Sequence, residues 1–252
     1  MSEKSTPVRG VTRRQVLTSG AAAVVLTASG RASAVTIDGT PQWRPFDHNA
    51  ADAVDPSQDW QFFTAEEAAT VEAITERLIP ADELSISGRE AGCAIFIDRQ
   101  LAGFFGTSER LYMQGPFVNG TPEQGDQSAL IPRQRYRVGL AALDDYCRRQ
   151  HQARFAELPG ESQDEVLSGL ERGEVPLEGI EAKEFFSLVH QNTMEGFFAD
   201  PVYGGNRDMV SWRMIGFPGA RYDYRDYIEK HNQKLDFEPL SIAGRSGWRT
   251  QG

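Results

Sequence analysis

The spacing of apolar residues constrains the fold of this chain more than any other feature of its sequence. A stripe with helical spacing, at i, i+4, i+7 and i+11, lies in a segment that begins near Arg133. Its members are Tyr136, Leu140, Leu143 and Cys147. No alternating apolar and polar run of any length, the pattern of a half-buried strand, is present. The sequence therefore predicts a mainly α fold class: a single helical domain with long Gly/Pro-rich loops and an extended N-terminal arm.

Local signals place two helices before this stripe. Thr64 and Glu67 have the spacing of a capping box, in which each side chain accepts a hydrogen bond from the other residue's backbone amide. Pro80 lacks an amide hydrogen and ends the helix that they begin. A second helix is predicted over 89–102. It is apolar around much of its circumference, so we expect it to be central and buried.

Two more helices and one long loop complete the pattern. Ser162 and Glu165 are predicted to cap a short helix, and a long helix with an apolar face is predicted over 181–198. The stretch 103–132 contains five glycines and three prolines. A structureless stretch of this length inside a compact domain is usually functional or bound to a partner.

Charge and cysteine content exclude several classes of function. The 252-residue chain has a net charge of −10, which argues against nucleic acid as a partner because phosphate binding needs a basic surface. Residues 1–34 hold five basic residues and one acidic residue, so the rest of the chain carries −14. Two cysteines are too few for a disulfide scaffold or for a four-cysteine zinc or iron–sulfur site.

The N-terminus has the pattern of a bacterial export signal. The pair Arg13-Arg14 precedes a short apolar stretch over 19–30, and Ala32-Ser33-Ala34 is a small-x-small cleavage site. The arginine pair indicates the twin-arginine (Tat) type, so the Tat translocase is an expected partner and the periplasm the expected location. Cleavage is predicted after Ala34. A transmembrane anchor is the disfavoured alternative, because the stretch is short and interrupted by Ser, Thr and Gly.

Motifs for catalysis or cofactor binding are absent from the rest of the sequence. There is no dinucleotide glycine fingerprint, no phosphate-binding loop, no zinc-protease pair of histidines and no covalent-haem motif. The four histidines have no metal-like spacing. His190 adjoins an apolar helix face and is expected to be a packing residue. We therefore assign no catalytic, cofactor-binding or metal-binding residue in this chain.

The two cysteines, Cys93 and Cys147, fall on apolar faces of two different predicted helices. Two small buried thiols are one interpretation. One inter-helix disulfide is the other, because the predicted destination is oxidising.

Residues 192–230 form the densest unusual segment of the chain. Gly204-Gly205-Asn206 and Pro218-Gly219 favour two tight turns. Aromatic residues, methionine and arginine lie between the turns, and these types are enriched in interface cores and hot spots. By composition alone, a partner interface and a well-packed loop cap with surface Arg–Asp pairs are equally open.

Four stretches carry a family resemblance. They are FFTAEEAATVEAITERLIP (62–80), REAGCAIFIDRQLAG (89–103), YRVGLAALDDYCR (136–148) and NTMEGFFADPVYGGNRDMVSWRMIGFPGARYDYRDY (192–227). Together they closely resemble the gluconate 2-dehydrogenase subunit 3 family, the small (gamma) subunit of membrane-associated FAD-dependent sugar and sugar-acid dehydrogenases. The resemblance spans about residues 62–242. The expected organisation is a Tat signal peptide (1–34), an extended acidic and aromatic arm (35–61), the helical domain (62–243) and a tail (244–252).

The resemblance implies an accessory role without catalysis. In such complexes a large GMC-type subunit carries FAD and performs the oxidation, and a multihaem cytochrome c subunit often passes electrons onward through haem c. The small subunit resembles a chaperone and export escort for the flavoprotein. Tat signals are typical of proteins that are exported already folded, often with a bound cofactor. Because this chain has no cofactor motif, its Tat signal fits the export of a bound flavoprotein partner. The complex would associate with the membrane, and the chain itself would hold no cofactor.

Residue type and loop context predict the partner contacts. These are Tyr203, Asn206, Arg207, Trp212, Arg221 and Tyr222. Two alternatives stay open: a stand-alone periplasmic oxidoreductase and a helical binding protein. For the former, a cleft near His190, Glu195, Arg207 and Tyr222 would be the place to look for an unrecognised site.

Overall fold

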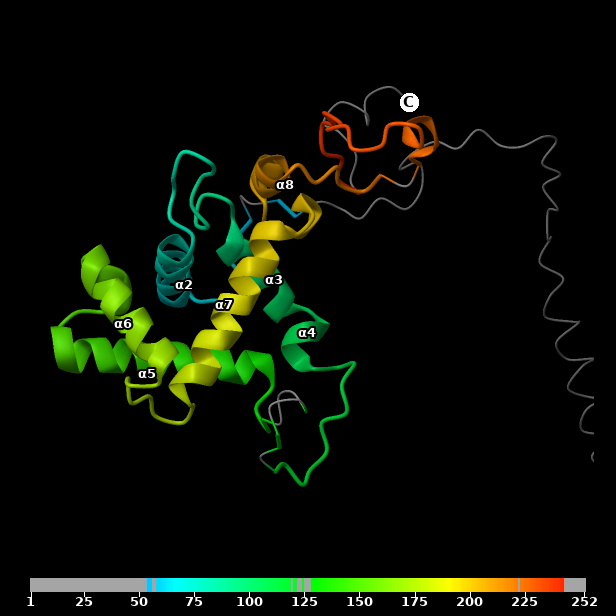
Figure 1. Cartoon of the computed structure of the whole chain (residues 1–252). Helices are drawn as coiled ribbons and strands as arrows, with labels where there is room; N and C mark the ends of the chain where they lie inside the picture. The colour runs from blue at the N-terminus through cyan, green and yellow to red at the C-terminus, as the bar shows by residue number, and fades with distance from the viewer. Residues whose placement is uncertain are drawn as a thin grey trace, which may run out of the picture. The chain divides into compact units, whose positions relative to one another are not determined.

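The structure is a computed structural model that describes residues 54–55, 58–118, 120–121, 124, 128–221 and 223–242. These residues contain seven α-helices and no strand, which confirms the mainly α fold (Figure 1). The helices are α2 Ala65–Leu78, α3 Cys93–Ala102, α4 Phe104–Thr107, α5 Pro132–His151, α6 Gly160–Arg172, α7 Ala182–Phe198 and α8 Val210–Ile215. Short 3-10 turns are η2 Phe155–Glu157, η3 Pro201–Tyr203, η4 Arg207–Met209 and η5 Arg225–Tyr227. Arg13, Arg14, Ala34, Tyr222, most of the arm and the tail lie outside the described residues.

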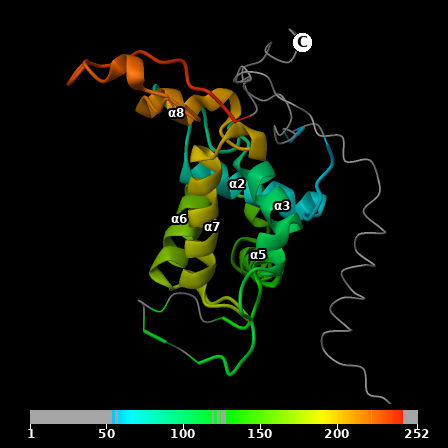
Figure 2. The same cartoon turned by 90° about the vertical axis from the view of Figure 1, so that its right-hand side faces the viewer.

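Helix α7 is the centre of the described fold. It packs against α2, α3, α5, α6 and α8. α6 runs beside it, and α8 lies at its C-terminal end (Figures 1 and 2). The loop before α5 lies at the opposite end of α7 in both views. No described helix is long and apolar enough to cross a membrane.

The main core forms where the α5 stripe meets α7. All four stripe residues are buried, as predicted. Tyr136 packs edge-on against Phe185 at 6.3 Å between ring centroids, and its hydroxyl donates to Asn192 Oδ1 at 3.0 Å. A Cβ at Gly139 would lie 2.2 Å from the Phe185 ring, so glycine is what lets α7 approach α5 this closely. The hydrogen bond to Asn192 offsets the free-energy cost of burying the Tyr136 hydroxyl.

The start of α2 agrees with the sequence. Thr64 Oγ1 accepts from the Glu67 amide at 3.2 Å, and Glu67 Oε2 accepts from the Thr64 amide at 2.8 Å. Both bonds of the capping box are therefore present. Arg137 from α5 pairs with Glu67 as well, which joins this helix end to the core.

Three local expectations need correction. α3 begins at Cys93 rather than at 89, because residues 88–92 form a turn whose Ala91 carbonyl accepts the Arg207 amide. α6 begins at Gly160 after Pro159, so Ser162 lies inside the first turn and caps nothing. The stretch 103–132 is not wholly structureless, since it contains α4.

The buried Asp98 side chain fixes the chain segment that enters the domain. Its carboxylate accepts the amides of Gln61, Phe62 and Phe63, each at 2.9 Å, and also pairs with Arg99. Three amides and a guanidinium replace the water that the carboxylate loses on burial. The entering segment is thereby held against α3.

Candidate partner-binding surface

The chain reverses tightly after α7, at the turn that the sequence predicts. Gly204 has φ 99° and Asn206 has φ 44°, which confirms the positive-φ turn. A Cβ at Gly205 would lie 2.1 Å from the Gly196 carbonyl oxygen, so only glycine allows the returning chain to lie on α7. The second predicted turn is confirmed by Gly219, with φ 75°.

Asn206 organises this turn from inside. Its side chain is fully buried, and its Nδ2 donates to the Ala199 carbonyl at 2.8 Å. Its Oδ1 accepts from the Ser211 amide at 3.0 Å and from the Ser211 hydroxyl at 2.8 Å. The prediction that Asn206 contacts a partner is therefore wrong. Its amide instead joins the end of α7 to the start of α8.

Trp212 has a similar internal role. Its side chain is buried, its Nε1 donates to the Phe198 carbonyl at 2.9 Å, and its ring packs edge-on against Phe217 at 5.1 Å. Trp212 is thus corrected from a direct partner contact to a support for Phe217. Its indole N–H has the hydrogen-bond partner that a buried tryptophan requires.

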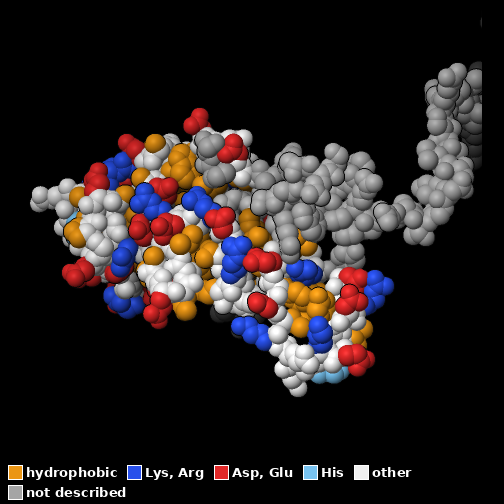
Figure 3. Space-filling view, turned by 90° about the horizontal axis from the view of Figure 1, so that it is seen from above, with side chains coloured by type: hydrophobic (Ala, Val, Ile, Leu, Met, Phe, Trp, Pro, Cys, Tyr) orange, Lys and Arg blue, Asp and Glu red, His pale blue; other side chains and the backbone are white. Residues whose placement is uncertain are grey.

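We use the name α8 surface for Arg207 and the large exposed apolar side chains on η3, on α8 and directly after α8. Its members are Tyr203, Arg207, Met214, Ile215 and Phe217. η4 contacts both η3 and α8, so consecutive elements present these side chains. Ile215 is 57% exposed, while Tyr203 and Phe217 are each 44% exposed. Figure 3 views the molecule from this end and shows hydrophobic side chains at the surface among charged ones.

Arg207 is the charged member of the α8 surface. Within the described part of the chain, no ion pair or side-chain hydrogen bond fixes its guanidinium, although its backbone is held by Ala91. Glu90 lies within its electrostatic reach. Hydrogen bonds from Ser87 lower the pKa of Glu90, and Arg207 adds to that effect. Arg207 is therefore an exposed cation available to an acidic group on another protein.

Arg221 lies in a different segment from the other predicted contacts. We call this segment, residues 218–242, the C-terminal loop. Its guanidinium stacks on Phe237 at 4.7 Å, and its Nη2 donates to the Glu238 carbonyl at 2.9 Å. The side chain is half-buried by these contacts. Arg221 thus holds the loop together, while its neighbour Tyr222 lies outside the described residues.

The two cysteines are separate free thiols in the structure. Cys147 lies in the main core, whereas Cys93 belongs to a second cluster with Ala91 and Phe197. Burial raises the pKa of each thiol to about 12, and Asp144 adds to the effect on Cys147. Both thiols are therefore protonated and unreactive at neutral pH. The structure has two small buried thiols rather than a disulfide pair.

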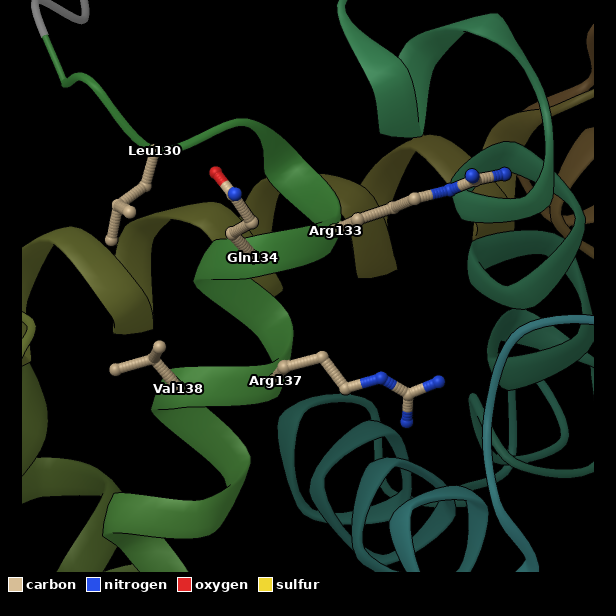
Figure 4. Close-up of a pocket in the computed structure, with 5 residues that line it drawn as sticks. All are labelled: Leu130, Arg133, Gln134, Arg137 and Val138. Carbon is tan, nitrogen blue, oxygen red and sulfur yellow. The ribbon is translucent and has the colours of Figure 1, made fainter.

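Two surface pockets lie on other faces. One of about 310 Å³ is lined by Leu130, Arg133, Gln134, Arg137 and Val138 (Figure 4). Both arginines are occupied within the chain. The Arg133 guanidinium donates to the last carbonyls of α3, and that of Arg137 donates to the Phe62 carbonyl. The second pocket, about 240 Å³, lies where α2 and α5 meet and includes Asp144 and Arg154, which form an ion pair.

The alternative catalytic cleft finds no support in these contacts. His190 is exposed and stacks on Phe186, with the ring planes 13° apart. Glu195 accepts from Gln191 and Asn192 on its own helix. Neither pocket above is lined by the residues proposed for that cleft. Among the described residues, no group of three or more His, Cys, Asp or Glu side chains could hold a metal.

Sequence reasoning missed the exposed apolar residues themselves. Met214, Ile215 and Phe217 lie in a short segment that Gly216 interrupts and Pro218 ends. An apolar run too short for a full helix, next to such breakers, is the signal that could have found them. A second exposed group is at the other end of α7, in the flagged stretch 103–132. It comprises Phe104, Leu111, Tyr112, Phe117 and Val118.

Together these features define a helical protein with a rigidly supported apolar surface at one end. The comparison with known families then identifies the chain: the model of the family described as gluconate 2-dehydrogenase subunit 3 matches residues 65–219. The chain belongs to this family, which implies association with a dehydrogenase complex. Searches of curated proteins and of solved structures gave no match.

Proposed function

We propose that this chain is the non-catalytic small (gamma) subunit of a periplasmic FAD-dependent, GMC-type gluconate or sugar dehydrogenase complex. In this role it assists folding of the flavoprotein subunit and carries it through the Tat translocase. FAD belongs to the large subunit, and haem c to a cytochrome subunit where the complex has one. Membership in the family supports the assignment to a dehydrogenase complex.

The observation that carries the binding role is the α8 surface. Ile215 and Phe217 are exposed although they are large and apolar, and the framework beneath them is fixed by Asn206 and Trp212. Exposed apolar side chains on a rigid support lose little conformational entropy when a partner covers them. Methionine, aromatic residues and arginine are also the types that interface cores favour. The surface therefore fits a protein partner.

The export role rests on the N-terminal pattern. Arg13-Arg14 and Ala32-Ser33-Ala34 precede the domain in the sequence. A chain bound to its flavoprotein before export would provide the translocation signal for both proteins. This accounts for a signal of the folded-export type on a chain whose sequence has no cofactor motif of its own.

The experiment is co-expression of this chain with a GMC-type flavoprotein subunit, followed by separation of periplasm and cytoplasm. We expect the flavoprotein in the periplasm only with the intact chain. Changing Arg13 and Arg14 together to lysine should leave both proteins in the cytoplasm, still bound to each other. Equal export of the flavoprotein without the chain, or with the double-lysine variant, would refute the escort role.

A further inference from the structure

The C-terminal loop leaves the end of α8 and returns to the same place. Gly219 and Leu240 form a parallel bridge at its base. The Ala220 amide donates to the Leu240 carbonyl at 2.6 Å, and the Leu240 amide donates to the Pro218 carbonyl at 3.2 Å. The loop lies at the α8 end of α7 in both views (Figures 1 and 2). About twenty residues are thus presented from one closed base beside the α8 surface.

One carboxylate joins this base to the rest of the surface. Asp200 Oδ1 accepts from the Val202 amide at 3.0 Å, which caps η3, and from the Ser241 hydroxyl at 2.6 Å. Its Oδ2 accepts from the Ile242 amide at 2.8 Å. Asp200 therefore connects the turn that carries Tyr203 with the returning end of the loop. Charge-assisted bonds of this kind are among the stronger ones in proteins.

The interior of the loop is ordered by a small aromatic cluster. Phe237 packs edge-on against Tyr227 at 4.8 Å and Tyr224 at 6.2 Å. Arg221 covers the same ring, and Lys230 lies over Tyr227 at 4.8 Å. The loop therefore has a preferred shape of its own.

The outer side of the loop is left exposed. Ile228 is 61% exposed, and Tyr224 is 39% exposed although it packs on Phe237. Beyond its base, the loop is tied to α8 by the Arg213–Glu238 ion pair at 3.4 Å. Ordering a long loop costs conformational entropy, and one small cluster offsets little of it. A covering partner would supply the missing contacts.

We infer that the C-terminal loop is a second docking element for the same GMC-type flavoprotein, and that Asp200 is the positioning residue that aligns it with the α8 surface. This inference rests on the proposed function. The same flavoprotein is the expected partner because the loop is continuous with the α8 surface. The loop begins directly after Phe217, and the Arg213–Glu238 pair joins it to α8. A protein that covers Ile215 and Phe217 meets the loop at its base. Tyr224 and Ile228 then extend the apolar contact.

The first test measures the affinity of the purified full chain for the purified flavoprotein. Ile228→Ser combined with Tyr224→Ser should raise Kd about tenfold or more, as expected when interface anchors are lost. Leu84→Ser is the matched control, since Leu84 is 68% exposed in another loop. Its Kd should equal that of the wild-type chain. An unchanged Kd for the double variant, with tight wild-type binding, would overturn the inference and leave the proposed function standing.

The second test isolates the positioning role of Asp200. Asp200→Asn and Ser241→Ala should each raise Kd severalfold and speed amide exchange over residues 223–238. In a chain whose residues 221–238 are replaced by Gly-Gly, Asp200→Asn should have no further effect on Kd. An undiminished effect there would show that Asp200 acts only through η3, which overturns the positioning role. Absence of wild-type binding would overturn the proposed function and this inference together. Loop variants that dissociate a homodimer while binding the flavoprotein normally would assign the loop to a second copy instead.

Discussion

The α5 stripe and the segment 203–217 are both rich in apolar and aromatic residues, but they place these residues in opposite environments. On α5, Tyr136 and Leu143 are buried against other helices. On α8, Met214 and Ile215 are exposed to solvent, as is Phe217 just beyond the helix. The two regions contain similar types of residue. They differ in how much of the chain packs against those residues.

Helix length explains the difference. α5 has 20 residues and faces α7 and η2, so a full stripe can be covered. α8 has six residues and makes its contacts with α7 and η4. One face of α8, with Ser211 and Trp212, is used to attach it, and the other has nothing in the described chain to cover it. An exposed apolar face on an attached element is a sign of interaction with another protein.

The largest expected loss of stability concerns the buried contact between α5 and α7. Phe185→Ala should destabilise the chain by about 3–5 kcal/mol, because it opens a cavity between α5 and α7. Urea denaturation measures this loss. Phe186→Ala is the control, since Phe186 is only partly buried. A loss below about 1 kcal/mol for Phe185→Ala would contradict the packing described.

Asn206→Ala tests whether Asn206 supports the α8 surface from inside the chain instead of contacting a partner. It should lower stability by about 2–3 kcal/mol, because the Ala199 carbonyl and the Ser211 amide lose a buried partner. Asn232 also has a positive φ but is exposed, so Asn232→Ala reproduces the backbone strain without the lost bonds. Thermal melting of both variants checks the prediction. Equal melting temperatures would mean that the buried amide contributes nothing.

The exposed side should show the reverse behaviour. Ile215→Ser and Arg207→Ala should each change stability by no more than about 0.5 kcal/mol. Each should weaken flavoprotein binding by about 2 kcal/mol, the loss typical of an interface hot spot. Denaturation and calorimetric titration of the same preparations separate the two effects. Retained affinity for both variants would remove the α8 surface from the interface.

The smallest effect concerns an ion pair on the surface of the helical core. Hydrogen bonding from Arg77 to Asp164 lowers the pKa of Asp164 below its ordinary range. The pair therefore adds stability above about pH 4, the ordinary Asp pKa, and loses it as pH falls through the lowered pKa. The side chains are 32% and 47% exposed, so the contribution should stay below about 1 kcal/mol.

Asp164→Asn tests this pair. Between pH 6 and pH 3 the wild-type chain should lose slightly more stability than the variant. Asp145→Asn, which alters an exposed pair with Arg148, is the control. Identical pH profiles for wild type and Asp164→Asn would show that the pair contributes nothing.

Sequence reasoning reaches most of the fold because its signals are local. The capping box at Thr64, the α5 stripe and the turn at Gly204 each depend on residues close together in the chain, and all three are present. The start of α3 could not be predicted in the same way. It depends on a backbone bond from Arg207, more than a hundred residues away.

The candidate site was predictable as a segment but not residue by residue. Tyr203 and Arg207 are exposed, whereas Asn206 and Trp212 are buried. Tryptophan and asparagine suit an interface and a buried turn equally well. The deciding feature is the position of two carbonyls at the end of α7. The Phe198 carbonyl accepts Trp212 Nε1, and the Ala199 carbonyl just beyond the helix accepts Asn206 Nδ2.

The most direct measurement is a titration of the purified full chain into the purified GMC-type flavoprotein, with the Ile215→Ser variant run in parallel. The account predicts saturable binding of the wild-type chain and clearly weaker binding of the variant, with both chains equally folded by circular dichroism. Absence of wild-type binding would contradict the claim that this chain is a flavoprotein-binding subunit.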